Sequence, residues 1–223
     1  VLTIARMLGV PSDMADQLLD WSHRMVGMYQ ANRDRAIEDA AAEASGEFAA
    51  YIGGFIDERR RKPDDDLITA LIAAEEDGQK LTRPELVSTC ILLLNAGHEA
   101  TVHAIGNGVK TLLESGRDLA RLVRPDAFDS RVEESLRFDP PLHMYDRYSY
   151  TDVDIDGHRF RRGDKIALLL AAANRDPAAF PEPDRFNPER DAGKNLAFGV
   201  GTHFCVGTGL AKLEIKRAFE TLF

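Results

Sequence analysis

The chain has 223 residues, of which 44% are hydrophobic, and its 28 basic and 37 acidic side chains give a formal net charge of −9, which suits one large or two small globular domains with a buried core. This charge has the wrong sign for electrostatic binding to nucleic acids or anionic membranes, so we expect neither partner. No apolar run reaches the roughly 18 residues that cross a bilayer, and no leader is visible. The two cysteines form no disulfide framework. We therefore expect a soluble, cytoplasmic protein.

Residues 1–139 have the apolar periodicity of helices. The longest predicted helix starts at Thr82, where Glu85 completes a capping box and Pro84 lies in the first turn. It would extend over 82–115, about 50 Å at the helical rise. Helices are predicted over 1–8, 13–30, 36–61, 67–75, 82–115, 117–123 and 127–138.

The pattern changes after residue 139, and residues 140–170 are expected to form a small β region. Asp156-Gly157 separates two short alternating segments, 153–155 and 158–160, which is typical of a hairpin with a type I′ turn. A third strand is predicted over 166–170. Residues 171–204 are expected to be an irregular loop that includes a cysteine loop, followed by a final helix over 205–223. The fold class is therefore mainly α with a small β part.

The most informative segment is the glycine-rich stretch Phe198–Gly207, which contains Cys205. Glycines on both sides of the cysteine allow the backbone to approach a flat ligand closely. At the start of a helix, backbone N–H groups and the helix dipole favour a thiolate, which is a metal ligand. If the metal is haem iron, the thiolate donates electron density that promotes O–O cleavage, and His203 can hydrogen-bond a peripheral carboxylate of the porphyrin.

Other interpretations of Cys205 stay open at this point. A glycine-rich turn with one small buried cysteine is ordinary structure. A zinc site is less well supported, because the chain has two cysteines and no Cys-x-x-Cys or His-x-x-x-His spacing. A cysteine-dependent hydrolase would use His203 as the base, but side chains at i and i−2 seldom reach that geometry. His23, His98, His103 and His158 share no spacing, and we assign them no metal.

The stretch Phe198–Gly207, with Leu210–Glu214 after it, resembles the cysteine loop and following helix of bacterial cytochromes P450, the haem-thiolate monooxygenases. The resemblance implies that Cys205 is the metal ligand of haem b, iron protoporphyrin IX. It places the other contacts to the cofactor in this segment at Phe198, Gly199, His203 and Gly207. Three further segments match in the order of the family, so the resemblance covers essentially the entire chain, as one partial domain over 1–223.

The first of these segments is Ala96–Thr101, which resembles the oxygen-binding groove of the family's long central helix. The resemblance implies that Ala96 and Gly97 border the oxygen site and that Glu99 and Thr101 handle protons. The family usually has threonine directly after the acid, whereas this chain has Ala100, so ordered water, Thr101 and a substrate hydroxyl remain alternative proton routes. The residues themselves predict a buried Glu99, because its helical neighbours are small or apolar. These neighbours are Leu92, Ala96, Val102 and Gly106.

The other two segments concern arginines. Glu134 and Arg137 lie at i and i+3, where a bidentate pair can form on one helix face. In the family such a pair is a buried structural clasp joined by a second arginine, which matches Arg190 here. Arg147, after the double proline, resembles an arginine that pairs with a haem propionate.

The resemblance implies a carboxyl-terminal portion of a monooxygenase that inserts one oxygen atom from O2 into a small organic substrate. Electrons would come from a separate ferredoxin or flavoprotein, because the chain contains no flavin or iron–sulfur motif. Family members are roughly twice as long, and their early helices have no counterpart before Val1. A truncated or degenerate haem-binding module without catalysis, and a cysteine-dependent hydrolase, are the alternatives.

Overall fold

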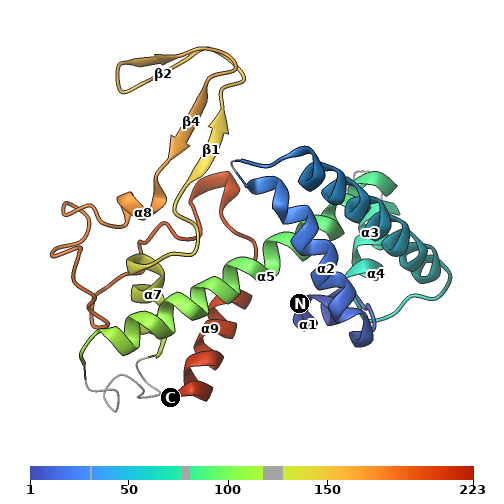
Figure 1. Ribbon diagram of the computed structural model, residues 1–223, viewed down its shortest axis with the longest axis horizontal. Coiled ribbons are helices and arrows are strands. Elements are labelled where there is room, and N and C mark those ends of the chain that lie inside the picture. The colour runs from blue at the N-terminus through green and yellow to red at the C-terminus, as the bar shows by residue number, and fades with distance from the viewer. Residues whose placement is uncertain (31, 77–80, 118–127) are drawn as a thin grey trace. The chain divides into compact units, whose positions relative to one another are not determined.

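The structure is a computed structural model that describes residues 1–30, 32–76, 81–117 and 128–223 (Figure 1). These residues are mainly helical with four short strands, which confirms the predicted fold class. They form two compact units, Val1–Glu99 and Ala100–Phe223. That the whole chain is one partial domain stays a prediction, and the predicted helix over 117–123 falls, except for residue 117, outside the described residues. Among the described helices, none has both the length and the apolar character needed to cross a membrane.

The first unit is a set of helices around one apolar core (Figure 1). Short 3-10 turns flank α2 at Ser12–Met14 and Gly27–Tyr29, so the single helix predicted over 13–30 is regular only in its middle. Phe48, Ile52 and Ile56 on α3 are completely buried at helical spacing, as the periodicity predicts. The helices of this unit are α1 Leu2–Met7, α2 Ala15–Val26, α3 Arg35–Arg61, α4 Leu67–Glu76 and the first part of α5 Arg83–Glu114.

Polar side chains fix where these helices begin. Asp34 accepts a hydrogen bond from the backbone N–H of Ile37 at 2.9 Å at the start of α3. At the start of α5 the Glu85 carboxylate accepts from both the backbone N–H and the hydroxyl of Thr82, each at 2.7 Å. The predicted helix over 82–115 is therefore confirmed to within one residue at either end.

The second unit packs α7 Phe128–Phe138 and α9 Thr208–Leu222 against the last part of α5 (Figure 1). Its core is made by side chains from all three helices. At Gly108 on α5 a Cβ atom would lie 2.5 Å from Cζ of Phe219, which is completely buried. The missing side chain at Gly108 is thus what allows α9 to lie this close to α5. The core side chains include Leu112, Phe128, Val132, Leu136, Ile215 and Phe219.

Two antiparallel pairs of short strands form the β part of this unit. β2 Val153–Ile155 and β3 His158–Phe160 form the predicted hairpin, with positive φ angles of 48° at Asp156 and 78° at Gly157, as a type I′ turn requires. β1 Tyr145–Tyr148 pairs with β4 Lys165–Leu168, with Tyr145 opposite Leu168. In Figure 1 the hairpin lies beyond the ends of these two strands.

Two boundaries in this unit differ from the prediction. The predicted strand over 166–170 is observed as β4, Lys165–Leu168, and the short helix α8 Leu170–Ala173 begins two residues after it. The final helix, predicted over 205–223, begins only at Thr208 with Gly207 as its N-cap. The positions before it form a 3-10 turn, Gly201–His203, and a turn at 206–207, so the glycine-rich segment continues as a loop past Cys205.

The close approach at Gly108 predicts that Gly108→Ala destabilises the protein. Overpacking a filled core costs about 1–3 kcal/mol, which outweighs the gain of up to about 1 kcal/mol that alanine brings to a helix interior. Gly106→Ala is the matched control, because nothing lies within 4 Å of its Cβ position on the same helix. Urea unfolding of both variants should show a lower midpoint for Gly108→Ala and no loss for Gly106→Ala. Equal midpoints would contradict this account of Gly108.

Candidate functional site: the cysteine loop and its clasp

The backbone of the cysteine loop depends on glycine at two turns. Gly199 and Gly201 have φ angles of +70° and +74°, in the region that side chains other than glycine rarely adopt. The loop closes on itself through the N–H of Cys205, which donates to the carbonyl oxygen of Phe198 at 3.0 Å. The position of the cysteine is therefore set by backbone geometry at the other end of the loop.

The thiol of Cys205 is exposed beside the start of α9. Cys205 lies three residues before the helix, rather than in its first turn as the sequence predicts. Its carbonyl oxygen accepts a hydrogen bond from the hydroxyl of Thr208 at 2.7 Å. A Cβ at Gly207 would be 3.8 Å from the sulfur, so the sulfur still lies against the residue that caps the helix.

Large apolar side chains around this loop face solvent. Val200, Phe204 and Val206 are all exposed, Val206 to 95%. Tyr145 at the start of β1 lies near the loop: burial raises the pKa of its hydroxyl, and the charge of Cys205 adds to the shift. Exposed apolar side chains gathered at a reactive group are typical of a ligand site. The strand segments next to Tyr145 contribute exposed Leu142, Met144, Leu168 and Leu169.

Arg147 and His203 are the side chains of this unit expected to contact acidic groups of a cofactor. The guanidinium of Arg147 on β1 donates to the carbonyl oxygen of Asp146 at 2.9 Å and lies 5.8 Å from the ring centre of Tyr145. In the part of the chain that the structure describes, no carboxylate lies within ion-pair distance of Arg147 or of the exposed His203. An accessible thiol, a glycine backbone, exposed apolar side chains, the guanidinium of Arg147 and the imidazole of His203 together fit a flat apolar cofactor with acidic substituents.

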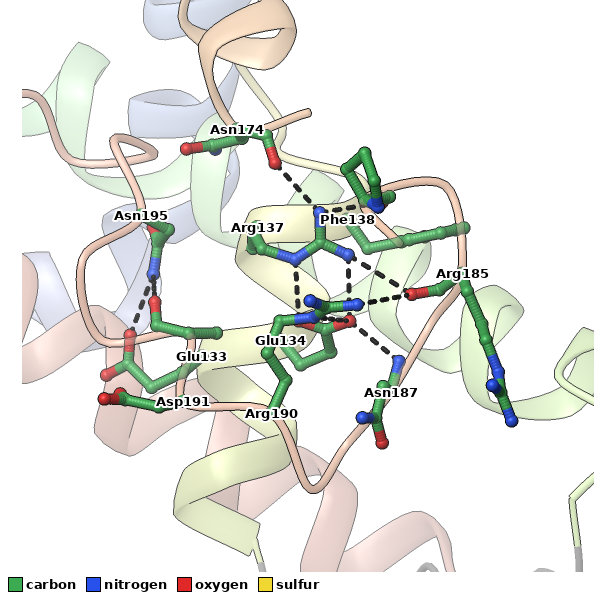
Figure 2. Close-up of polar contacts among 12 residues, drawn as sticks. Glu133, Glu134, Arg137, Phe138, Asn174, Arg185, Asn187, Arg190, Asp191 and Asn195 are labelled. Carbon is green, nitrogen blue, oxygen red and sulfur yellow. Dashed lines mark hydrogen bonds and ion pairs between the residues drawn. The ribbon is translucent and has the colours of Figure 1, made fainter. Parts of the chain in front are cut away.

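The three residues of the expected clasp come together in the structure (Figure 2). Glu134 and Arg137 on α7 have completely buried side chains and form a bidentate pair, with Nε–Oε2 at 2.7 Å and Nη2–Oε1 at 2.9 Å. Nε of Arg190 lies 3.4 Å from Oε1 of Glu134, and the N–H of Asn187 donates to the same oxygen at 2.8 Å. The clasp thus joins α7 to the irregular loop.

The clasp is also connected to the cysteine loop, which sequence reasoning did not show. Arg137 donates to the carbonyl oxygen of Asn174 at 2.9 Å, as Figure 2 shows. The side-chain oxygen of Asn174, which is buried, accepts from the N–H of Leu196 at 2.7 Å. Leu196 is two residues before Phe198, which holds Cys205. Asn174 and Leu196 are 22 positions apart, so no local sequence pattern signals this hydrogen bond.

The expected oxygen-binding residues lie on α5, and the structure differs from the sequence prediction at Glu99. A Cβ at Gly97 would lie 2.6 Å from Cδ1 of Ile4, so α1 packs closely at this position. Glu99 is only half-buried, not buried. The neighbours expected to bury it are themselves exposed, Leu92 to 60% and Val102 to 62%. Ala96 is exposed and Thr101 is half-buried.

A buried histidine next to Glu99 was missed by the sequence reasoning. Nδ1 of His98 lies 3.3 Å from the carbonyl oxygen of Leu94 and 3.4 Å from the hydroxyl of Ser22 on α2. Burial lowers the pKa of His98, and the contact with Leu94 partly opposes the shift. Its ring also faces His23, 5.9 Å away between ring centres. No sequence spacing signals this contact, because 75 positions separate the two histidines.

Comparison with known proteins finds relatives along the entire chain. The sequence model of the family Cytochrome P450 matches residues 127–223. The chain is 40% identical over 220 residues to the biotin biosynthesis cytochrome P450 of Bacillus subtilis (strain 168), covering 98% of this chain and 55% of that protein. It is also 40% identical over 226 residues to the vitamin D(3) 25-hydroxylase of Pseudonocardia autotrophica, covering 100% of this chain and 54% of the relative.

The fold is shared with solved structures of such proteins. The crystal structure of P450BioI in complex with hexadec-9Z-enoic acid ligated acyl carrier protein matches with a TM-score of 0.92 and 39% identity. The match covers 98% of this chain and 57% of that one. The expected partial fold, with a long helix and a cysteine loop before the last helix, is therefore confirmed. The chain spans about half the length of the relatives it matches.

The buried clasp predicts that Arg137→Ala lowers the free energy of unfolding by about 3–5 kcal/mol, because it leaves the carboxylate of Glu134 buried without its main partner. Arg217→Ala is the matched control: Arg217 forms an i,i+3 pair with Glu220 at 2.7 Å on α9, but its side chain is exposed. Removing an exposed pair costs about 0–1 kcal/mol. Denaturant unfolding of both variants measures the difference, and similar losses in the two would refute the assignment of the clasp.

Proposed function

The chain belongs to the cytochrome P450 family, and on that premise we propose that it is part of a haem-dependent monooxygenase that inserts one oxygen atom of O2 into a small organic substrate. Members of this family bind haem b. The observation that carries the proposal is the exposed thiol of Cys205 in a loop with glycine turns and exposed apolar side chains. Bound haem would supply the activation of O2, and a thiolate ligand favours O–O cleavage.

The residues of the second unit would hold the cofactor. The Sγ of Cys205 would be the metal ligand, bound as a thiolate. Gly199 and Gly207 have no side chains that would separate the backbone from the ring. Arg147 and His203 would bind the two propionates, since neither is engaged with an acidic side chain of the described residues. Phe198 would fix the loop through its hydrogen bond to the cysteine N–H.

The residues on α5 would handle protons and border the oxygen site. The half-buried carboxylate of Glu99 can take a proton from water and hold it at its oxygens. Ala100 has no hydroxyl, so a side-chain hydroxyl is offered only one position later, by Thr101, about 100° further around the helix. Ala96 and Gly97 would form the edge of the oxygen site by the resemblance to the family.

The substrate and the electron donor are proposed from the relatives. Two of these are named for biotin biosynthesis and for hydroxylation of vitamin D(3), and one structure contains a fatty acid ligated to acyl carrier protein. We therefore propose a small organic, largely apolar substrate. A separate ferredoxin or flavoprotein would supply the electrons, as the resemblance to bacterial members of the family implies.

Cys205→Ser in the complete protein should abolish the Soret band of a thiolate-ligated haem in the reduced carbon monoxide difference spectrum, because an alcohol does not replace the thiolate. Cys90→Ala is the control: Cys90 is buried in the first unit, where burial raises its pKa to about 11, and its loss should leave the band in place. An unchanged band in Cys205→Ser would refute the proposed ligand. A wild-type protein that binds haem without oxidising any substrate would support the non-catalytic alternative, and hydrolysis without haem would support the hydrolase.

Arg147→Ala should weaken retention of haem, because one propionate loses its cation. We expect faster transfer of haem from the variant to an acceptor apoprotein than from the wild type. Arg159→Ala on β3 is the control, since the exposed Arg159 already pairs with Asp152 at 3.1 Å. Equal transfer rates for wild type and Arg147→Ala would contradict the assignment.

A further inference from the structure

Three potential metal ligands lie together in the first unit, outside the cysteine loop. His23 comes from α2, and His98 and Glu99 come from α5. One ligand atom from each residue lies within 4.8 Å of the other two. We infer that these side chains form a binding site for a divalent transition-metal ion, with Zn²⁺ as the ion that fits the ligands.

The chemistry of the donors selects the class of metal. Two imidazoles and one carboxylate form zinc sites with three protein ligands, in which the fourth position stays open for water, as in several zinc enzymes. Imidazole suits Zn²⁺ and its neighbours in the transition series, whereas Mg²⁺ and Ca²⁺ prefer oxygen ligands. The cluster therefore favours Zn²⁺ over the hard divalent cations.

The contacts behind His98 orient it as a ligand. Its Nδ1 lies 3.3 Å from the carbonyl oxygen of Leu94 and 3.4 Å from the hydroxyl of Ser22, and both of these residues are completely buried. With Nδ1–H donated to the carbonyl oxygen, the ring presents the lone pair of Nε2. Metal-binding histidines commonly use one ring nitrogen for such an outer contact, which fixes the tautomer and the direction of the ring.

The remaining two ligands allow an ion to enter and to be closed in. His23 is exposed and Glu99 is half-buried, so the site opens to solvent on this side. Zinc ligands lie about 2.0–2.2 Å from the ion. Binding would therefore draw the three atoms closer together, which rotation of the exposed His23 side chain can achieve while His98 stays in place.

A bound ion would also occupy the carboxylate of Glu99. This consequence rests on the proposed function, in which the same carboxylate handles protons, and it predicts that Zn²⁺ inhibits the monooxygenase. Binding itself does not depend on that function. The test below therefore measures the metal and not the reaction.

The test is titration of the complete protein with Zn²⁺ against a chromophoric chelator. His23→Ala and Glu99→Gln should each weaken binding at this site by more than the ~10–100-fold that loss of an outer contact costs. His98 is left unchanged, because a substitution at this buried position changes packing. His103→Ala is the control, since His103 is an exposed histidine on the same helix.

Wild-type affinity in both His23→Ala and Glu99→Gln would overturn the proposal, as would an equal loss in His103→Ala. Circular dichroism of each variant shows whether the helices are intact, and His23 is exposed, so its removal leaves the core unchanged. If Zn²⁺ binds as expected but Cys205→Ser retains a thiolate-type spectrum, the proposed function fails and the metal site stands.

Discussion

Two opposite charges are completely buried in the second unit, and this unit is arranged so that neither is left without a partner. The carboxylate of Glu134 accepts from Arg137, Arg190 and the backbone of Asn187, while Arg137 also donates to loop carbonyl oxygens. Removing such charges from water is costly, and the cost is offset only when all their hydrogen bonds are made. The hydrogen bonds that these two buried charges require therefore fix the backbone of the irregular loop.

The same network of hydrogen bonds extends to Cys205, the residue that the proposed chemistry requires. Arg137 donates a hydrogen bond to the backbone of Asn174, and the side chain of Asn174 accepts one from Leu196. The backbone of Phe198 in turn accepts one from the N–H of Cys205. None of these hydrogen bonds involves the sulfur of Cys205. The thiol can therefore remain exposed and available for ligation while its backbone is held by a buried network.

Features governed by local signals were predictable from the sequence, and features that depend on distant contacts were not. The type I′ hairpin, the long helix over 82–115 and the i,i+3 pair on α7 depend on residues within a few positions of one another. The start of α9 is a local exception: the hydroxyl of Thr208 bonds to the carbonyl oxygen of Cys205, three positions earlier, and the helix begins at Thr208 rather than at residue 205. The exposure of Glu99 and the contact of Gly97 with Ile4 depend on which helices cover α5, and no pattern within α5 contains that information.

Three successive positions of α5 face three different surroundings. Gly97 lies against Ile4 of α1, His98 reaches Ser22 of α2, and Glu99 remains accessible to water. For directed evolution this means that a library randomised over the segment would mix unrelated defects. Variants at the first two positions would also change the packing against α1 and α2, whereas the third position can be screened for altered turnover by itself.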